Sequence, residues 1–225
     1  MKTLDLMGKQ RGKRSSSNAA AMHGKALVFR TNLFGLKNLK VADSFGDFGG
    51  VAWHQGYYPE AERLEKQALE IRTNLLGTND IKVADTYGDL GTIFWFAGEW
   101  QQAEPLMRQS LAICRKLLGD KNADTVLALE DLAGFLSAED KLPQTETAQR
   151  EALKLNIELR GTNHPDVGFS LNNLADTLEA EGKLSEAESF ARQALALRMT
   201  VLGTNRPDCA HSLFELAISW RTKAI

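Results

Sequence analysis

Apolar residues return at the spacing of an α-helix through most of the chain. Between residues 165 and 202 they fall three or four positions apart as far as Leu178, stop at Gly182 and Lys183, and resume at Ala187. This spacing gathers apolar side chains on one face of a helix, whereas a half-buried strand would show strict alternation. The segment therefore predicts two helices joined by a short turn.

This helical hairpin recurs with a period of 42 residues. A constant period of this length is typical of stacked-repeat architectures, in which each repeat buries its apolar face only against its neighbours. We therefore expect an all-α array that offers a surface for binding. Fixed slots of the period hold glycine at Gly35, Gly77, Gly119, Gly161 and Gly203, and glutamate at Glu62, Glu104, Glu146 and Glu188.

The period also gives the expected organisation of the chain. A basic leader at residues 1–17 precedes an array over residues 18–222, which begins with a second helix alone and ends with a first helix alone. The expected segments are a half repeat at 18–34, full repeats at 39–76, 81–118, 123–160 and 165–202, and a terminal helix at 207–222.

One slot on the first helix of each repeat holds only small residues. A side chain of this size leaves room for the neighbouring helix, so we expect the two helices of a repeat to approach closely there. The residues at this slot are Gly49, Gly91, Ala133, Ala175 and Ala217.

Charge is distributed unevenly along the chain. Residues 1–40 hold nine of the 27 lysines and arginines but one of the 29 acids, which leaves 18 bases against 28 acids from residue 41 onward. An acidic array is poorly suited to following a phosphate backbone, so we do not expect nucleic acid as a partner. No apolar run reaches the roughly 18 residues of a membrane span, so we expect no membrane partner either.

Cysteine usage suggests a location. Cys114 and Cys209 fall at different slots of the repeat and are too few for a disulfide framework. We expect both to be reduced thiols, Cys209 at a buried slot, in a cytoplasmic protein. The leader lacks the apolar core of a secretory signal, which agrees with that location.

No motif for catalysis or cofactor binding stands out. The glycines from Gly46 to Gly50 lie inside a helical pattern rather than in a phosphate-binding loop, and no cysteines and histidines have zinc spacing. His164, Asp166 and Ser170 lie close together in sequence, but capping of a helix start explains them better than a catalytic triad. We therefore expect no enzyme, no metal and no cofactor.

The fourth repeat carries a recognisable signature. Its runs Asn163–Val167, Leu171–Ala175 and Glu181–Glu188 resemble the 42-residue tetratricopeptide repeat of kinesin light chains. The resemblance covers about residues 18 to 222. It implies a right-handed superhelix of antiparallel helix pairs, a solenoid whose concave groove is lined by the first helix of each repeat.

The resemblance also implies which residues face that groove. Acidic residues hold many of these slots, with two tryptophans beside them, whereas family members that clamp a peptide's terminal carboxylate hold Lys, Arg and Asn at some of them. Only Asn172 and Asn173 match the asparagines that grip a peptide backbone in kinesin light chains. The implied peptide-binding residues are Asp43, Asp47, Trp53, Asp85, Asp89, Trp95, Glu130, Asp131, Asn172, Asn173 and Asp176.

Two functions from different classes follow. The first is a non-catalytic scaffold that binds an extended peptide or a partner helix in its groove, with a preference for basic segments carrying apolar anchors. The alternative is a regulatory fragment of a larger signalling enzyme such as a kinase, which the basic start and the half repeat at each end suggest. A nucleic-acid-binding helical repeat is a third class, against which the acidic array argues.

Overall fold

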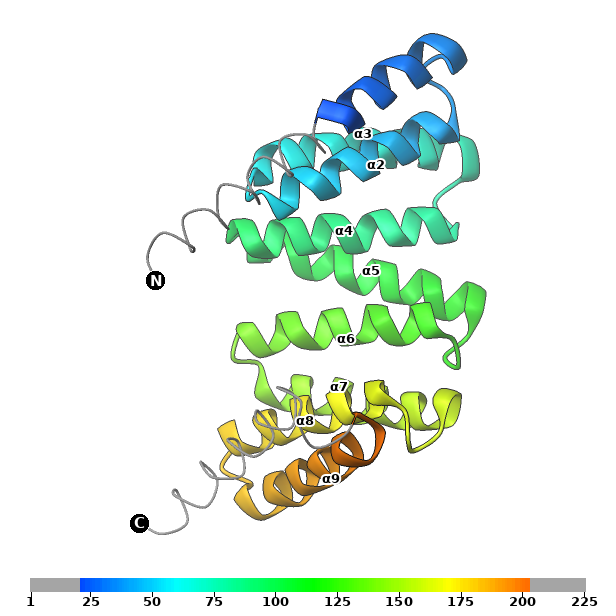
Figure 1. Ribbon diagram of the computed structural model, residues 1–225. Coiled ribbons are helices and arrows are strands. Elements are labelled where there is room, and N and C mark those ends of the chain that lie inside the picture. Colours follow the sequence, from blue (N-terminus) through cyan, green and yellow to red (C-terminus); the bar gives the residue numbers. More distant parts are fainter. Residues whose placement is uncertain (1–20, 203–225) are drawn as a thin grey trace, which may run out of the picture. The chain divides into compact units, whose positions relative to one another are not determined.

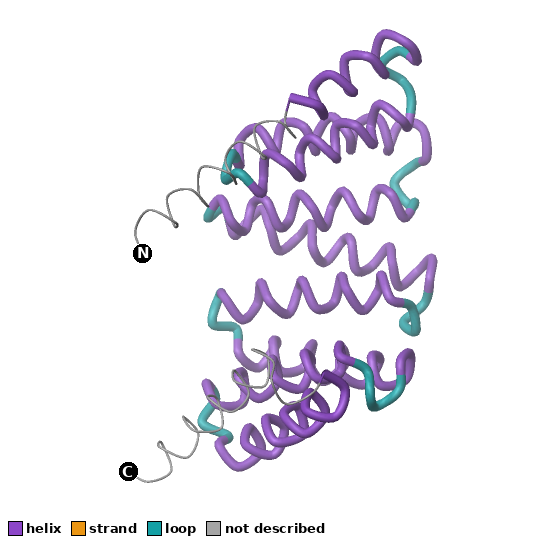
Figure 2. Tube along the Cα trace, in the orientation of Figure 1, coloured by secondary structure: helices purple, strands orange, loops and turns teal. Residues whose placement is uncertain are grey.

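The computed structural model describes residues 21–202, and every regular element in that range is an α-helix (Figures 1 and 2). The all-α class expected from the sequence is therefore confirmed for these residues. The expected leader, the terminal helix at 207–222 and Cys209 lie outside the described residues. The chain divides into two compact units, an N-terminal body, Met1–Leu117, and a C-terminal body, Leu118–Ile225.

The N-terminal body stacks antiparallel helices in chain order. A helix over residues 21–34 comes first, α3 packs against α2, and α4 packs against α3 (Figure 1). The bounds are α2 Leu39–His54, α3 Tyr58–Leu76, α4 Ile81–Ala97 and α5 Trp100–Leu118.

The C-terminal body repeats this arrangement. Here α6 packs against α7, α7 against α8, and α8 against α9. The bounds are α6 Ala123–Ala138, α7 Leu142–Arg160, α8 Pro165–Ala180 and α9 Leu184–Leu202.

The first helix of each repeat begins at a polar cap. The side chains of Asn38, Asp80, Asn122 and His164 each accept a hydrogen bond from the backbone N–H two residues further on. Such a bond satisfies one of the donors that a helix start leaves without an intrahelical partner. His164 therefore holds the start of α8, with its Nδ1 atom 3.2 Å from the backbone nitrogen of Asp166.

The slot of small residues marks a close approach between the two helices of a repeat. A Cβ atom added to Gly49 would lie 2.7 Å from Oε1 of Glu65, and one added to Gly91 would lie 2.7 Å from Cγ of Met107. Both distances are shorter than van der Waals contact. Glycine at these positions therefore lets α3 lie close against α2, and α5 close against α4.

The recurring glutamate slot forms a regular series of ion pairs. Each glutamate pairs with a basic residue four positions later on the same second helix. The pairs are Glu62–Lys66 at 2.7 Å, Glu104–Arg108 at 2.8 Å, Glu146–Arg150 at 2.7 Å and Glu188–Arg192 at 2.7 Å. Exposed pairs of this kind stabilise a helix by only about 0.3–0.5 kcal/mol each, so they support the second helices without determining the fold.

The turn inside each repeat requires a left-handed backbone. Gly56, Gly98 and Gly182 provide it with φ of 78°, 81° and 76°. In the third repeat the same turn holds Asp140, whose φ is 57° and which is the one non-glycine residue with positive φ among the described residues. A side chain in this region of backbone space is strained, although aspartate tolerates it better than most residues.

We therefore expect Asp140→Gly to raise the free energy of unfolding by about 1 kcal/mol through relief of this strain. Urea unfolding followed by circular dichroism would measure the change. The matched control is Gly182→Asp, which places the same side chain in the corresponding turn of the fourth repeat and should destabilise by a similar amount. Loss of stability in Asp140→Gly would contradict this account of the turn.

Candidate functional site

Six of the residues assigned to the groove lie on the two first helices of the N-terminal body. Asp47, Asp85 and Asp89 are exposed, and we call the surface of α2 and α4 that carries them the acidic face. A Cβ atom added to Gly50 would meet no atom within 4 Å, so α2 is open to approach at that position. The acidic face therefore combines exposed carboxylates with a stretch of bare helix backbone.

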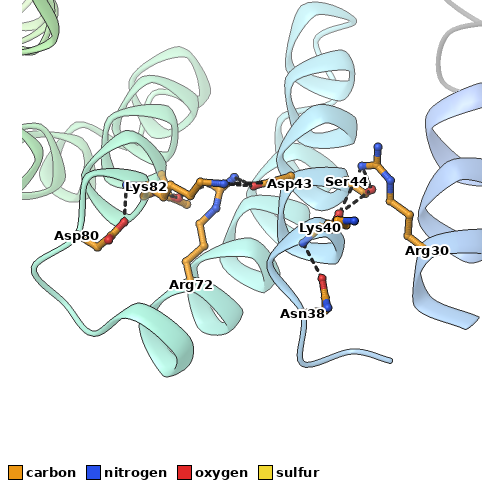
Figure 3. A network of polar contacts seen from close by, with 9 residues as sticks. Arg30, Asn38, Lys40, Asp43, Ser44, Arg72, Asp80 and Lys82 are labelled. Atoms are coloured by element: carbon orange, nitrogen blue, oxygen red, sulfur yellow. Dashed lines mark hydrogen bonds and ion pairs between the residues drawn. The ribbon is translucent and has the colours of Figure 1, made fainter. Parts of the chain in front are cut away.

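Asp43 is bound to two neighbouring helices. Its carboxylate accepts hydrogen bonds from Arg72 on α3 at 3.1 Å and from Lys82 on α4 at 3.1 and 3.2 Å (Figure 3). Burial acts to raise the pKa of Asp43, but these two cationic partners outweigh it and lower that pKa. Asp43 thus joins α2, α3 and α4, and most of its charge is already balanced within the fold.

The guanidinium of Arg72 forms a joint between successive repeats. Its Nη1 atom donates to the hydroxyl of Thr86 at 2.6 Å, and Thr86 in turn donates to the carbonyl of Lys82 at 2.7 Å. One repeat earlier, Arg30 donates to the hydroxyl of Ser44 at 2.7 Å in the same way (Figure 3). In both repeats, an arginine near the end of a second helix therefore binds the first helix that follows it.

The C-terminal body builds the same joint with an amide. Nδ2 of Asn156 on α7 lies 3.0 Å from the hydroxyl of Ser170 on α8 and 2.9 Å from Oε1 of Glu130 on α6. Burial raises the pKa of Glu130, while the hydrogen bonds from Ser170 and Asn156 oppose that rise. Glu130, a residue assigned to the groove, therefore holds three helices together.

Glu65 places a buried carboxyl beneath the acidic face. The residue lies on α3 and is 2% exposed, and its Oε2 atom has no hydrogen-bond partner. Burial raises the pKa of Glu65 to about 8; repulsion from Asp89 and Asp47 adds to the shift, and Arg72 opposes it. The side chain is therefore largely protonated at neutral pH.

Aromatic rings gather at the carboxyl ends of α2 and α4. The ring of Phe96 lies 5.6 Å from Trp53 and 6.5 Å from Tyr58, and half of Phe96 is exposed. Trp53 and Trp95 are half-buried, and the indole nitrogen of Trp53 has no partner. The two tryptophans thus pack partly into the body while Phe96 extends the cluster to the surface.

The remaining groove candidates lie on the first helices of the C-terminal body. Asp131 on α6 and Asp176 on α8 are exposed, although partial loss of hydration still raises the pKa of Asp131. Asn173 is half-buried. Asn172 is 4% exposed, and neither its amide oxygen nor its amide nitrogen has a hydrogen-bond partner.

The sequence-based assignment missed the second-helix residues of this region, Glu65, Arg72 and Asn156. A signal for two of them was present, because one slot near the end of the second helix is polar within an otherwise apolar pattern. That slot holds Arg30, Arg72, Asn156 and Arg198, with Cys114 in the second repeat. No such signal marks Glu65, since its slot holds Met107, Gln149 and Ala191 in the other repeats.

Two other kinds of site are absent from residues 21–202. This range holds no cluster of three or more histidine, cysteine or acidic side chains suited to a metal, and none of its helices has the length and hydropathy needed to cross a membrane. An open hollow of about 360 Å³ lies over α7, lined by Arg150, Leu153, Lys154, Ile157, Glu158 and Leu174. None of these six was a candidate from the sequence.

Comparison with known proteins confirms the resemblance seen in the sequence. The profile of the tetratricopeptide repeat family matches residues 40–116 and 124–200. No match was found among curated protein sequences.

Solved structures show the same fold. BtubC (BKLC) from P. vanneervenii is 18% identical, with a TM-score of 0.80 over 93% of this chain and 84% of that one. A protein described as a putative kinesin light chain with nearly identical TPR-like repeats, from Podosopora anserina, is 21% identical, with a TM-score of 0.73 over 81% and 86% of the two chains. PilF of Pseudomonas aeruginosa is 20% identical, with a TM-score of 0.59 over 81% and 69%.

Burial of the Glu65 carboxyl predicts how the free energy of unfolding depends on pH. The folded chain holds the Glu65 proton up to about pH 8, whereas the unfolded chain releases it near pH 4.5. Between these values the free energy of unfolding should fall as pH rises, at up to about 1.4 kcal/mol per pH unit from this group.

Glu65→Gln removes the titrating group and should therefore flatten that dependence. Urea unfolding of both proteins at intervals from pH 5 to pH 8.5 would measure the difference, with Glu70→Gln, an exposed residue on the same helix, as the control. Equal slopes for wild type and Glu65→Gln would show that Glu65 titrates normally.

Proposed function

The chain belongs to the tetratricopeptide repeat family, whose repeats mediate contacts between proteins, and we propose that this member binds an extended basic segment of a partner protein. In this proposal the chain is a non-catalytic scaffold of the cytoplasm. The segment lies along the first helices, and its basic residues face the carboxylates while its apolar residues contact the tryptophans.

The exposed carboxylates of the acidic face carry this proposal. Asp47 and Asp89 occupy the same slot in successive repeats, and Asp85 lies one turn before Asp89 on α4. The charge of Asp43 is balanced by Arg72 and Lys82. Asp47, Asp85 and Asp89 are all exposed to solvent. Such a surface attracts basic segments from a distance and repels acidic ones.

Aromatic rings beside the carboxylates supply the short-range part of binding. Phe96 is exposed next to Trp53, and Trp95 lies on α4 one helical turn beyond Gly91. Aromatic side chains in contact with a partner bury large apolar areas and are enriched among the residues that dominate interface energies. Apolar side chains of the basic segment would lie against them.

The unpaired amide of Asn172 on α8 is a second observation in favour of a peptide ligand. A buried amide without hydrogen bonds costs about 1–3 kcal/mol, and both polar atoms of Asn172 are in that state. An extended peptide offers a backbone N–H and a backbone C=O at every residue, which are the two groups that an asparagine amide pairs with. A ligand backbone that reached this amide would pair with both atoms.

The test begins with a peptide array that samples basic, neutral and acidic sequences. We expect the strongest hits to be basic, and we expect Asp47→Lys together with Asp89→Lys to slow their association and to weaken its dependence on salt. Trp95→Ala should instead raise the dissociation rate. Surface plasmon resonance at several salt concentrations separates the two effects.

Glu70→Lys serves as the control for charge, because Glu70 is exposed on the second helix α3 rather than on the acidic face. Circular dichroism of Trp95→Ala would establish that the fold is kept. Acidic hits, or basic hits that bind all variants alike, would place the ligand on another surface of the chain.

A further inference from the structure

The Glu65 side chain extends from α3 to the side of α2 that carries Gly46 and Gly49. Its two carboxyl oxygens lie 3.7 and 3.8 Å from the position of a Cβ atom on Gly46, with Nη2 of Arg72 beside them at 3.5 Å. Gly46 is partly exposed and shares the slot of Gly88, Glu130 and Asn172 on the other first helices. Because Gly46 has no side chain, the Glu65 carboxyl and the Arg72 guanidinium lie directly against the backbone of α2 at this point.

Burial of the Glu65 carboxyl is unfavourable because one of its oxygens forms no hydrogen bond. Oε2 of Glu65 has no hydrogen-bond partner, although the side chain is almost completely removed from water. Burial without a hydrogen bond is unfavourable for any polar group and more so for a charged one. A ligand that supplied a donor to this oxygen would offset that cost.

The repeats themselves show that the fold does not need an acid at this slot. Met107, Gln149 and Ala191 occupy the corresponding positions of the other full repeats, and all three are also buried. At the corresponding position, the second repeat therefore has a thioether, the third an amide and the fourth a methyl group. Glu65 departs from the other repeats in charge rather than in packing.

Charged residues from α2, α3 and α4 act on this carboxyl. Asp47 on α2 and Asp89 on α4 act as like charges, and Arg72 on α3 acts as an opposite charge. Arg72 is itself engaged with Asp43 and Thr86. A cation brought next to Glu65 would oppose the repulsion that Asp47 and Asp89 exert on its carboxylate.

We propose that Glu65 recognises a single arginine or lysine of the bound segment, whose cationic group enters where Gly46 leaves α2 without a side chain and pairs with the Glu65 carboxylate. Asp47 and Asp89 flank the same cation at the surface. The inference rests on the proposed function, since it names the residue that selects one basic position within the bound segment.

Binding in this way is coupled to a proton. The pKa of Glu65 is raised to about 8, so the side chain is mostly protonated at pH 7. A cation in contact with it favours the charged form, and the proton leaves to solvent when the ligand binds. Affinity for a basic ligand should then rise with pH up to about 8 and level off above it.

The test uses the full chain and three pools of fluorescein-labelled nonapeptides. The central residue is arginine, lysine or citrulline, which is a neutral analogue of arginine, and the other eight positions are randomised. We expect wild type at pH 8 to prefer the arginine or the lysine pool over the citrulline pool by at least about tenfold, as close charge pairs at interfaces do. The stronger of the two identifies guanidinium or ammonium as the preferred group.

Glu65→Gln copies the residue that Gln149 provides in the third repeat, and Glu65→Met copies Met107. Both variants should fold, bind the pools weakly, and lose most of the preference for the charged centre. Wild-type preference should increase from pH 6 to pH 8, whereas that of Glu65→Gln should not change.

The outcomes separate this inference from the proposed function. If wild type binds no pool, both fail. If wild type binds the three pools equally, or if Glu65→Gln keeps the preference and its pH dependence, the proposed function stands and the role of Glu65 is overturned. Circular dichroism would show whether Glu65→Met loses binding because it is unfolded. In that case the result for Glu65→Gln decides.

Discussion

Close packing of two antiparallel helices over a residue with little side chain is the constraint on which this structure depends. In the first repeat that residue is Gly49, and the space it leaves is taken by the carboxyl of Glu65. In the second repeat Gly91 makes the same room for Met107. The same close packing therefore gives two different contacts. Between α4 and α5 the contact is apolar, whereas between α2 and α3 it buries the Glu65 carboxyl against α2.

Polar side chains on the second helices perform two tasks in this array. Arg30, Arg72 and Asn156 donate to a hydroxyl on the next first helix, and these bonds fix one repeat against the next. These bonds pair each donor with a hydroxyl, although Nε of Arg72 is also buried without a partner. Glu65 forms no such joint between repeats, and its unpaired oxygen is the group that we assign to a ligand.

The fold could be predicted from the sequence because a 42-residue period determines both helices of every repeat. The caps and the small slot repeat with it, as does the turn glycine in every full repeat but the third, and each has a local physical reason. The candidate site was less accessible. Asp43 and Glu130 were assigned to the groove by resemblance, but both are bound to neighbouring helices through Arg72 and Asn156. These bonds join residues 29 and 26 positions apart, and helical periodicity does not reveal such pairs.

The protonation of Glu65 can be measured, and it depends both on burial of the carboxyl and on the acids of the acidic face. Carbon-13 NMR of the full chain labelled at glutamate carboxyl carbons, with the Glu65 signal assigned by its absence in Glu65→Gln, would follow it directly. The account predicts a titration midpoint near pH 8 in the unbound chain, and a lower midpoint after addition of the arginine-centred nonapeptide pool. A midpoint near the ordinary value of 4.5 in the unbound chain, or one that the pool leaves unchanged, would contradict it.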